Sequence, residues 1–120
     1  MTLRTGLEHL ESAQELGAVL KKHENVMVCC GRMGPMCIPV YGIMERLRES
    51  YTHVAFRDMD YDGPGSDRIA GLPECASFMG LPMTVYFRNG EVVAATSSIQ
   101  TAEQVTGILD EKFGPPPEAG

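Results

Sequence analysis

The sequence predicts an α/β fold, with a central mixed β-sheet of about five strands flanked by about four helices. Three observations support this prediction. Strand-like and helix-like stretches alternate along most of the chain. One strand-like stretch, 26–30, is apolar throughout, which is typical of a strand buried on both faces. Two later stretches are joined by Asn89-Gly90, a dipeptide that favours a tight hairpin turn.

The first half of the chain is expected to contain two strands and two helices. Ser12 and Glu15 have the spacing of a capping box, in which both side chains satisfy free amides at a helix start. Pro39 is tolerated only in the first turn of a helix, so the second helix should begin near Met36 or Cys37. The four expected elements are a strand over 6–10, a helix over 13–23, a strand over 26–30 and a helix through residue 47.

The second half is expected to add three strands and two helices. Gly71 and Pro73 should interrupt the first of these helices. A second capping-box pattern, Thr101 to Gln104, precedes the last helix. The expected elements are a strand over 52–60, a turn over 61–65, a helix over 66–79, strands over 83–88 and 91–96, and a helix ending at 113. Residues 1–113 should form one domain, and the Pro-rich residues 114–120 a disordered tail.

The net charge and the distribution of apolar residues argue against nucleic acids and membranes as partners. A net charge of -6 argues against binding nucleic acid or an anionic membrane, since both attract clustered Lys and Arg. No apolar run approaches the ~20 residues of a membrane span, and no signal core follows the first residues. We therefore expect a cytoplasmic protein, as a monomer or weak dimer. No phosphate-binding Gly loop or Ser/His/Asp set is present, and we expect no cofactor.

Cysteines are concentrated at one place in the sequence. Cys29, Cys30 and Cys37, three of the four cysteines, lie within twelve residues that run from the apolar strand into a Gly/Pro-rich loop. A structural disulfide set would be scattered along the chain, and cytoplasmic cysteines stay reduced unless they are catalytic or sensing. If the protein is catalytic, we expect the cysteine thiols of this site to be the reacting groups.

Two local patterns resemble the thioredoxin family, over about residues 6–113. One is Gly80-Leu81-Pro82 followed by a strand and the hairpin Phe87-Arg88-Asn89-Gly90-Glu91. The other is the buried strand that leads into Gly34-Pro35 and a helix. The resemblance implies that the peptide bond before Pro82 is cis and that Pro82 faces a redox site. It also implies that a substrate chain pairs with the backbone at this proline.

The redox motif departs from the family's Trp-Cys-Gly-Pro-Cys pattern. Matching the Gly-Pro pair places Met33 and Met36 at the two cysteine positions. Matching the helix places Cys37 at the second cysteine and Gly34 at the first, and we prefer this register because the helix's apolar positions then fall on its buried face. The exposed attacking cysteine is missing in both registers, so the active site is degenerate, which argues against an ordinary thioredoxin activity.

The cysteines receive different expected roles. Cys37 lies at a helix N-terminus, where free amides and the helix dipole stabilise a thiolate, so it is the candidate catalytic thiol. Cys30 is its candidate disulfide partner, provided that the two Cα atoms lie within ~7 Å; the alternative is a small buried core residue. By strand alternation Cys29 should point into the core on the other side. Cys75 could be a regulatory thiol, but a structural role is favoured.

Methionines suggest a binding surface near the same loop. Met33, Met36 and Met83 should gather on one surface in a thioredoxin-like fold, and Met is common at adaptable peptide-binding surfaces. Binding of a soft metal ion by Cys and Met is a less favoured alternative. The remaining methionines, Met27, Met44, Met59 and Met79, are expected to fill the core. The candidate substrate-binding residues are Met33, Gly34, Pro35, Met36, Leu81, Pro82 and Met83.

Two functions therefore stay open. The first is thiol–disulfide exchange with a protein or peptide partner through Cys37, with Cys30 as candidate partner thiol. The second is a redox-inactive module that binds a peptide or protein on the Met-lined surface around Pro82. Asp58 and Asp60, which alternate at a strand end, could handle a proton but are more readily explained as a solvated strand terminus.

Overall fold

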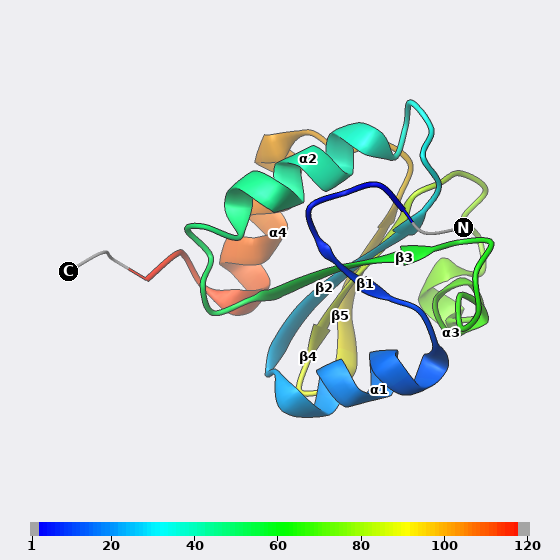
Figure 1. Cartoon of the computed structure of the whole chain (residues 1–120). Coiled ribbons are helices and arrows are strands. Elements are labelled where there is room, and N and C mark those ends of the chain that lie inside the picture. The colour runs from blue at the N-terminus through cyan, green and yellow to red at the C-terminus, as the bar shows by residue number, and fades with distance from the viewer. Residues whose placement is uncertain (1–2, 118–120) are drawn as a thin grey trace.

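A computed structural model describes residues 3–117 and contains one mixed β-sheet (Figure 1). The strand order is β1-β3-β2-β4-β5. β3 pairs in parallel with both β1 and β2, whereas β4 runs antiparallel to both β2 and β5. The strands are β1 (Glu8–Leu10), β2 (Asn25–Gly31), β3 (Ala55–Asp60), β4 (Met83–Arg88) and β5 (Glu91–Ser97). The predicted α/β fold with a five-stranded mixed sheet is confirmed.

Helices cover both faces of the sheet. Figure 1 shows α2 and α4 on one face and α1 and α3 on the other. A short 3₁₀ helix, Pro73–Cys75, follows α3. The α-helices are α1 (Ala13–Lys22), α2 (Ile38–Leu47), α3 (Asp67–Ala70) and α4 (Ala102–Phe113).

β2 is the centre of this arrangement. All seven of its residues are buried, as the uninterrupted apolar run predicted. Because side chains alternate along a strand, successive residues of β2 enter two separate core clusters. The α2–α4 cluster includes Met27, Cys29, Cys37, Tyr41, Met44, Tyr86 and Leu109. The α1–α3 cluster includes Leu16, Val28, Cys30, Ile69, Cys75, Met83 and Val85.

Local sequence signals set the turns and the helix starts. Asn89 and Gly90 both have positive φ, 52° and 81°, which a two-residue hairpin turn of the primed type requires. At α4, the Thr101 side chain accepts from the Gln104 amide and the Gln104 side chain accepts from the Thr101 amide, so the capping box is complete. At α1, Ser12 accepts from the Glu15 amide, but the Glu15 carboxylate accepts from Glu11 instead.

The segment between β3 and β4 differs from the prediction. The predicted helix over 66–79 is only the four residues of α3 and the 3₁₀ turn, because Gly71 and Pro73 end the helical pattern. Met79, predicted to fill the core, is fully exposed, at 100%. The other three methionines assigned to the core, Met27, Met44 and Met59, are buried.

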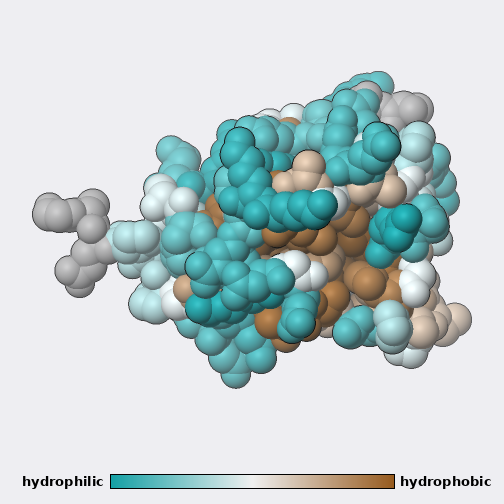
Figure 2. Space-filling model, turned by 90° about the horizontal axis from the view of Figure 1, so that it is seen from below, coloured by the Kyte–Doolittle hydropathy of each residue, from teal (hydrophilic) through white to brown (hydrophobic). Residues whose placement is uncertain are grey.

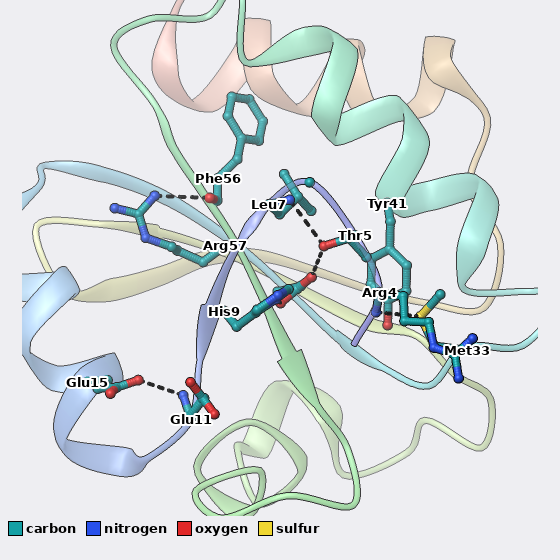
Figure 3. A network of polar contacts seen from close by, with 12 residues as sticks. Arg4, Thr5, Leu7, His9, Glu11, Glu15, Met33, Tyr41, Phe56 and Arg57 are labelled. Atoms are coloured by element: carbon teal, nitrogen blue, oxygen red, sulfur yellow. Dashed lines mark hydrogen bonds and ion pairs between the residues drawn. The ribbon is translucent and has the colours of Figure 1, made fainter. Parts of the chain in front are cut away.

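The expectation for Asp58 is wrong as well. The sequence predicts a solvated strand terminus, but the Asp58 side chain is completely buried in β3. Thr5 donates a hydrogen bond to one carboxylate oxygen, and His9 Nδ1 lies 2.6 Å from the other. The N-terminal segment therefore closes over Asp58 and supplies the polar partners that a buried carboxylate needs (Figure 3).

The C-terminal end of the described chain has no regular secondary structure. Residues 114–117 form neither helix nor strand, and 118–120, the rest of the expected tail, lie outside the described residues. The partly buried side chains of Leu20, Phe78 and Val92 pack against the α1–α3 cluster. Figure 2, seen from below, shows an apolar area on the surface of the molecule. Within residues 3–117, no helix is long and apolar enough to cross a membrane.

Candidate functional site

The candidate site is the loop that connects β2 to α2. Gly31 ends β2, and Cys37 is the N-cap residue of α2. Backbone hydrogen bonds from the Cys37 and Ile38 amides to the Gly34 carbonyl, at 3.1 and 3.0 Å, close a turn just before the helix. Pro39 occupies the first turn, where its missing N–H costs nothing. The helix start predicted from Pro39 is therefore correct to within two residues.

Cys37 is buried but has a polar contact. Its side chain is only 3% exposed and packs in the α2–α4 cluster. The Arg32 amide N–H donates to Cys37 Sγ over 3.4 Å. A donor of this kind favours the negatively charged form of sulfur, and so does the N-terminus of the ten-residue helix α2.

Gly31 brings Cys37 next to two other groups. The Leu81–Pro82 peptide bond is cis, the form that the family resemblance implied. A Cβ placed on Gly31 would lie 2.8 Å from Cys37 Sγ, 2.8 Å from the Tyr41 hydroxyl and 3.0 Å from Pro82 Cβ. Because all three atoms crowd the same point, only a glycine fits between them. Sulfur, phenol and proline thus meet at the end of β2.

Arg32 is held on three sides. Its amide contacts Cys37, and its carbonyl accepts a hydrogen bond from the Tyr41 hydroxyl at 3.1 Å. Its guanidinium donates two hydrogen bonds to the Asp62 carboxylate, at 2.7 and 2.9 Å, and lies 5.2 Å from the centre of the Tyr61 ring. The hydrogen bond from Arg32 lowers the pKa of Asp62, and the same bond raises the pKa of Arg32.

The next loop residue is tied to the N-terminal segment. The Arg4 amide donates to Met33 Sδ at 3.3 Å. Figure 3 shows this contact beside Tyr41, which extends from α2 toward the same region. The loop that covers Cys37 is therefore anchored at consecutive residues, Arg32 and Met33.

The other three cysteines are held in the thiol form by burial. All four cysteines are free thiols, and all are buried. Burial raises the pKa of Cys29 well above its usual value, although a hydrogen bond from Thr84 at 3.7 Å opposes the shift. Burial likewise raises the pKa of Cys30 to about 12 and raises that of Cys75. In these positions the thiol form is favoured over the reactive thiolate.

The structure separates the two cysteines that were proposed to pair. Cys30 lies in the α1–α3 cluster, whereas Cys37 lies in the α2–α4 cluster. Cys75 shares the Cys30 cluster, and Cys29 shares the Cys37 cluster. A bond between Cys30 and Cys37 therefore requires one side chain to leave its face of the sheet.

The predicted substrate-binding residues are only partly brought together. Pro35 and Met36 are exposed, Met33, Gly34 and Leu81 are half-buried, and Pro82 and Met83 are buried. Met83 belongs to the α1–α3 cluster, while Met33 packs against the other cluster. The three methionines Met33, Met36 and Met83 do not share one exposed surface, because alternation along β4 turns Met83 away from the loop.

Several site residues were not predicted from the sequence. Tyr41 lies four residues after Cys37, on the same face of α2, and this spacing was the available signal. No local signal identified the contact between Arg32 and Asp62, which are thirty residues apart.

Two large apolar residues, Ile38 and Ile99, are exposed, at 47% and 44%. Ile99 follows Ser98, whose amide donates to the Pro82 carbonyl at 3.0 Å.

Metal binding has little support in this geometry. Within residues 3–117, no three His, Cys, Asp or Glu side chains are grouped closely enough to hold a metal ion. The exposed Met36 and the half-buried Met33 have no cysteine exposed beside them, since every cysteine is buried.

Solved structures share this arrangement of strands and helices. A thioredoxin from Plasmodium falciparum matches 89% of the chain and 99% of its own length, with a TM-score of 0.70 and 20% identity. A mutant thioredoxin from Halobacterium salinarum matches 92% of the chain and 94% of its own, with a TM-score of 0.73 and 19% identity. The chain has a thioredoxin-like fold.

A third thioredoxin, from Chlamydomonas reinhardtii, matches 92% of the chain and 99% of its own length, with a TM-score of 0.75 and 16% identity. No protein-family model matches the sequence, and a search of curated proteins finds no match. At identities of this size the comparison shows the thioredoxin-like fold alone.

Proposed function

We propose that this thioredoxin-like protein carries out thiol–disulfide exchange through Cys37. The position of the Cys37 sulfur carries the proposal. The sulfur accepts a hydrogen bond from the Arg32 amide, and it lies beside Pro82 at the start of α2. Among the four cysteines, only Cys37 combines a backbone N–H donor with a helix N-terminus. Both features favour the thiolate, which is the nucleophile in exchange.

The proposed first step forms a mixed disulfide. The Cys37 thiolate attacks one sulfur of a partner's disulfide, a Cys37–partner bond forms, and the other partner sulfur leaves as a thiolate. The Cys37 side chain is almost completely buried, so the loop over it has to move when the partner approaches. The partner chain would dock beside Leu81 and Pro82.

Cys30 is the proposed thiol for the second step. Its thiolate would attack the Cys37 sulfur, form a Cys30–Cys37 disulfide and release the second partner thiolate, so that the partner is reduced. Burial of Cys30, its raised pKa and its position on the other face of the sheet from Cys37 make this step slow. The proposal therefore predicts that the mixed disulfide at Cys37 accumulates before the second bond forms.

A trapping experiment tests this function. The reduced protein is mixed with a short peptide that contains one intramolecular disulfide, the reaction is quenched with acid, and the adducts are mapped by mass spectrometry. We expect the peptide on Cys37, and a larger amount in Cys30→Ala because the second step is blocked. Cys29→Ala is the matched control, and it should resemble the wild type. Adducts absent from Cys37 in all three proteins would contradict the proposal.

A binding function without redox chemistry is the second candidate. It is favoured by the exposed apolar side chains at the start of α2, Met36 and Ile38, at 44% and 47%. Such residues are common in adaptable binding surfaces. Met36→Ser and Ile38→Ser together should weaken peptide binding in this case, whether or not Cys37 is replaced by serine.

The cellular setting is part of the same proposal. We place the protein in the cytoplasm, where thiols are kept reduced and Cys37 would be available as a thiolate. The partner is a protein or peptide that carries a disulfide. We propose that the protein works as a monomer or weak dimer, since exchange at Cys37 needs residues of one chain only.

A further inference from the structure

We propose that Tyr41 is a positioning residue for Cys37, because its hydroxyl holds the backbone of Arg32 so that the Arg32 amide points at the Cys37 sulfur. The inference rests on the proposed function of Cys37. Tyr41 would act on Cys37 only by fixing the backbone of Arg32, and it would not contact the substrate. The two hydrogen bonds that define it are Tyr41 Oη to the Arg32 carbonyl, 3.1 Å, and the Arg32 amide to Cys37 Sγ, 3.4 Å.

The backbone of Arg32 has to be held in place if its amide is to face the Cys37 sulfur. Arg32 lies in the loop after the last residue of β2, and its side chain is 55% exposed. Its guanidinium interacts with Asp62, which is also largely exposed, at 57%, and ion pairs of this kind are weak and screened by salt. The amide that faces the sulfur therefore requires an anchor that water and salt do not compete with.

Tyr41 provides such an anchor. It is 2% exposed, and it belongs to the first turns of α2, so its position is fixed by the same helix that carries Cys37. Its buried hydroxyl would lose a hydrogen bond if it did not reach the Arg32 carbonyl. Burial raises the pKa of Tyr41, so the phenol remains a donor at any ordinary pH.

Gly31 makes this geometry possible. The point at which its Cβ would stand is 2.8 Å from both the Tyr41 hydroxyl and Cys37 Sγ. The absence of a side chain lets the phenol and the sulfur approach β2 together, with Arg32 as the next residue in the chain. Gly31, Tyr41 and the Arg32 backbone thus form one unit around the sulfur.

A comparison of two tyrosines tests the inference. Tyr41→Phe removes only the hydroxyl that holds Arg32. Tyr86→Phe is the matched control, because the Tyr86 hydroxyl is buried and has no hydrogen-bond partner in the part of the chain that the structure describes. For each folded protein the rate of Cys37 alkylation by iodoacetamide is measured against pH, with the labelled peptides resolved by mass spectrometry.

The pH profile separates positioning from packing. Its midpoint reports the stability of the thiolate, and its plateau at high pH reports access to the sulfur. We expect Tyr41→Phe to raise the midpoint by about 0.5–1 pH unit, which lowers the rate near neutral pH by about three- to tenfold. Tyr86→Phe should leave the midpoint at the wild-type value.

Each outcome has a defined meaning. An unchanged midpoint in Tyr41→Phe, with Cys37 reacting normally in the wild type, overturns the role of Tyr41 alone. Failure of Cys37 to react in the folded wild type overturns the proposed function, and the role of Tyr41 with it. If Tyr41→Phe does not fold, Tyr41→Met is measured instead, since methionine fills irregular spaces and also lacks the hydroxyl.

Discussion

The two faces of the sheet contain buried residues of different kinds. The buried polar side chains recorded for residues 3–117 are Asn25, Asp58 and Thr84, and strand alternation places all three on the side of α2 and α4. Tyr41 and Cys37 belong to the same side. On the opposite side, no buried residue of the α1–α3 cluster has an oxygen or nitrogen in its side chain.

The proposed role of Cys37 implies that burial alone does not decide whether a cysteine is reactive. Cys30, on the α1–α3 side, is buried among apolar groups, and its pKa of about 12 keeps it as a thiol. Cys37 is also buried, but a backbone amide and a helix N-terminus face its sulfur. Cys29 lies on the same side as Cys37, and burial raises its pKa well above the usual value. The backbone amide and the helix N-terminus at the sulfur, rather than exposure or the side of the sheet, therefore distinguish Cys37 as the candidate catalytic thiol.

The largest expected effect comes from replacing one thiol on each side. Cys37→Ser should reduce the rate of peptide-disulfide reduction to background, because serine is not a nucleophile in exchange. Cys75→Ala, the counterpart on the α1–α3 side, should keep the rate within about twofold of the wild type, since Cys75 shares the cluster of Cys30 but takes part in neither proposed step. The rate is followed by separating the peptide's oxidised and reduced forms. An equal loss of the reduction rate in both variants would contradict the proposal that the cysteines on the two sides of the sheet have different roles.

A second prediction concerns Gly31 and stability. Gly31→Ala should lower the free energy of unfolding by about 1–3 kcal/mol, because the new methyl group overlaps Cys37, Tyr41 and Pro82. Gly17→Ala in α1 is the control. No atom lies within 4 Å of its Cβ position, and alanine should stabilise the helix by about 0.5–1 kcal/mol. Urea unfolding measures both. Stabilisation by Gly31→Ala would show that the site is not tightly packed.

A third prediction uses the buried carboxylate of the α2–α4 side. Burial raises the pKa of Asp58 above its ordinary 3.8, although Thr5 and His9 oppose the shift and Glu45 adds to it. The folded state then binds the proton more tightly than the unfolded state does. The contribution of Asp58 to stability is therefore present below pH 3.8 and decreases as pH rises through the folded pKa.

The Asp58→Asn variant has no carboxyl group that titrates at this position, so comparing it with the wild type isolates the contribution of Asp58 to the pH dependence of stability. The free energy of unfolding of Asp58→Asn, minus that of the wild type, should increase between about pH 4 and pH 7. Unfolding by urea at several pH values measures it. If this difference decreases over the same range, the carboxylate is stabilised as an anion in the folded protein, and our account of its surroundings is wrong.

The smallest expected effect belongs to the exposed ion pair. Asp62→Asn should change the free energy of unfolding by less than about 1 kcal/mol, because Asp62 and Arg32 are both more than half exposed. The change should shrink further in 1 M salt. A loss that stays large at high salt would mean that Asp62, rather than Tyr41, is the main anchor of Arg32.

Much of the fold could be predicted because its signals are local. Asn89-Gly90 specifies a turn through the φ angles that those two residues tolerate. Thr101 and Gln104 specify a helix start through two hydrogen bonds three residues apart. The apolar run of β2 records burial on both faces directly.

The rest depends on contacts between distant residues. The buried Asp58 carboxylate has its hydrogen-bond partners in Thr5 and His9, about fifty residues earlier in the chain. Met83 was predicted from its neighbour Pro82 to lie at the site, but alternation along β4 places it in the other cluster. The position of Cys37 in the site could be predicted from the helix pattern, whereas the partners of its sulfur could not, because Arg32 and Tyr41 reach it through the loop fold.

The most direct test of the account is the alkylation rate of each cysteine in the folded, reduced protein. Iodoacetamide is added near neutral pH, and labelling of the four cysteines is followed over time by mass spectrometry. We predict that Cys37 is labelled well before Cys29, Cys30 and Cys75, which should react only as fast as the protein unfolds. If Cys37 is labelled at the same slow rate as Cys29, its polar surroundings do not activate it, and the proposed exchange function is wrong.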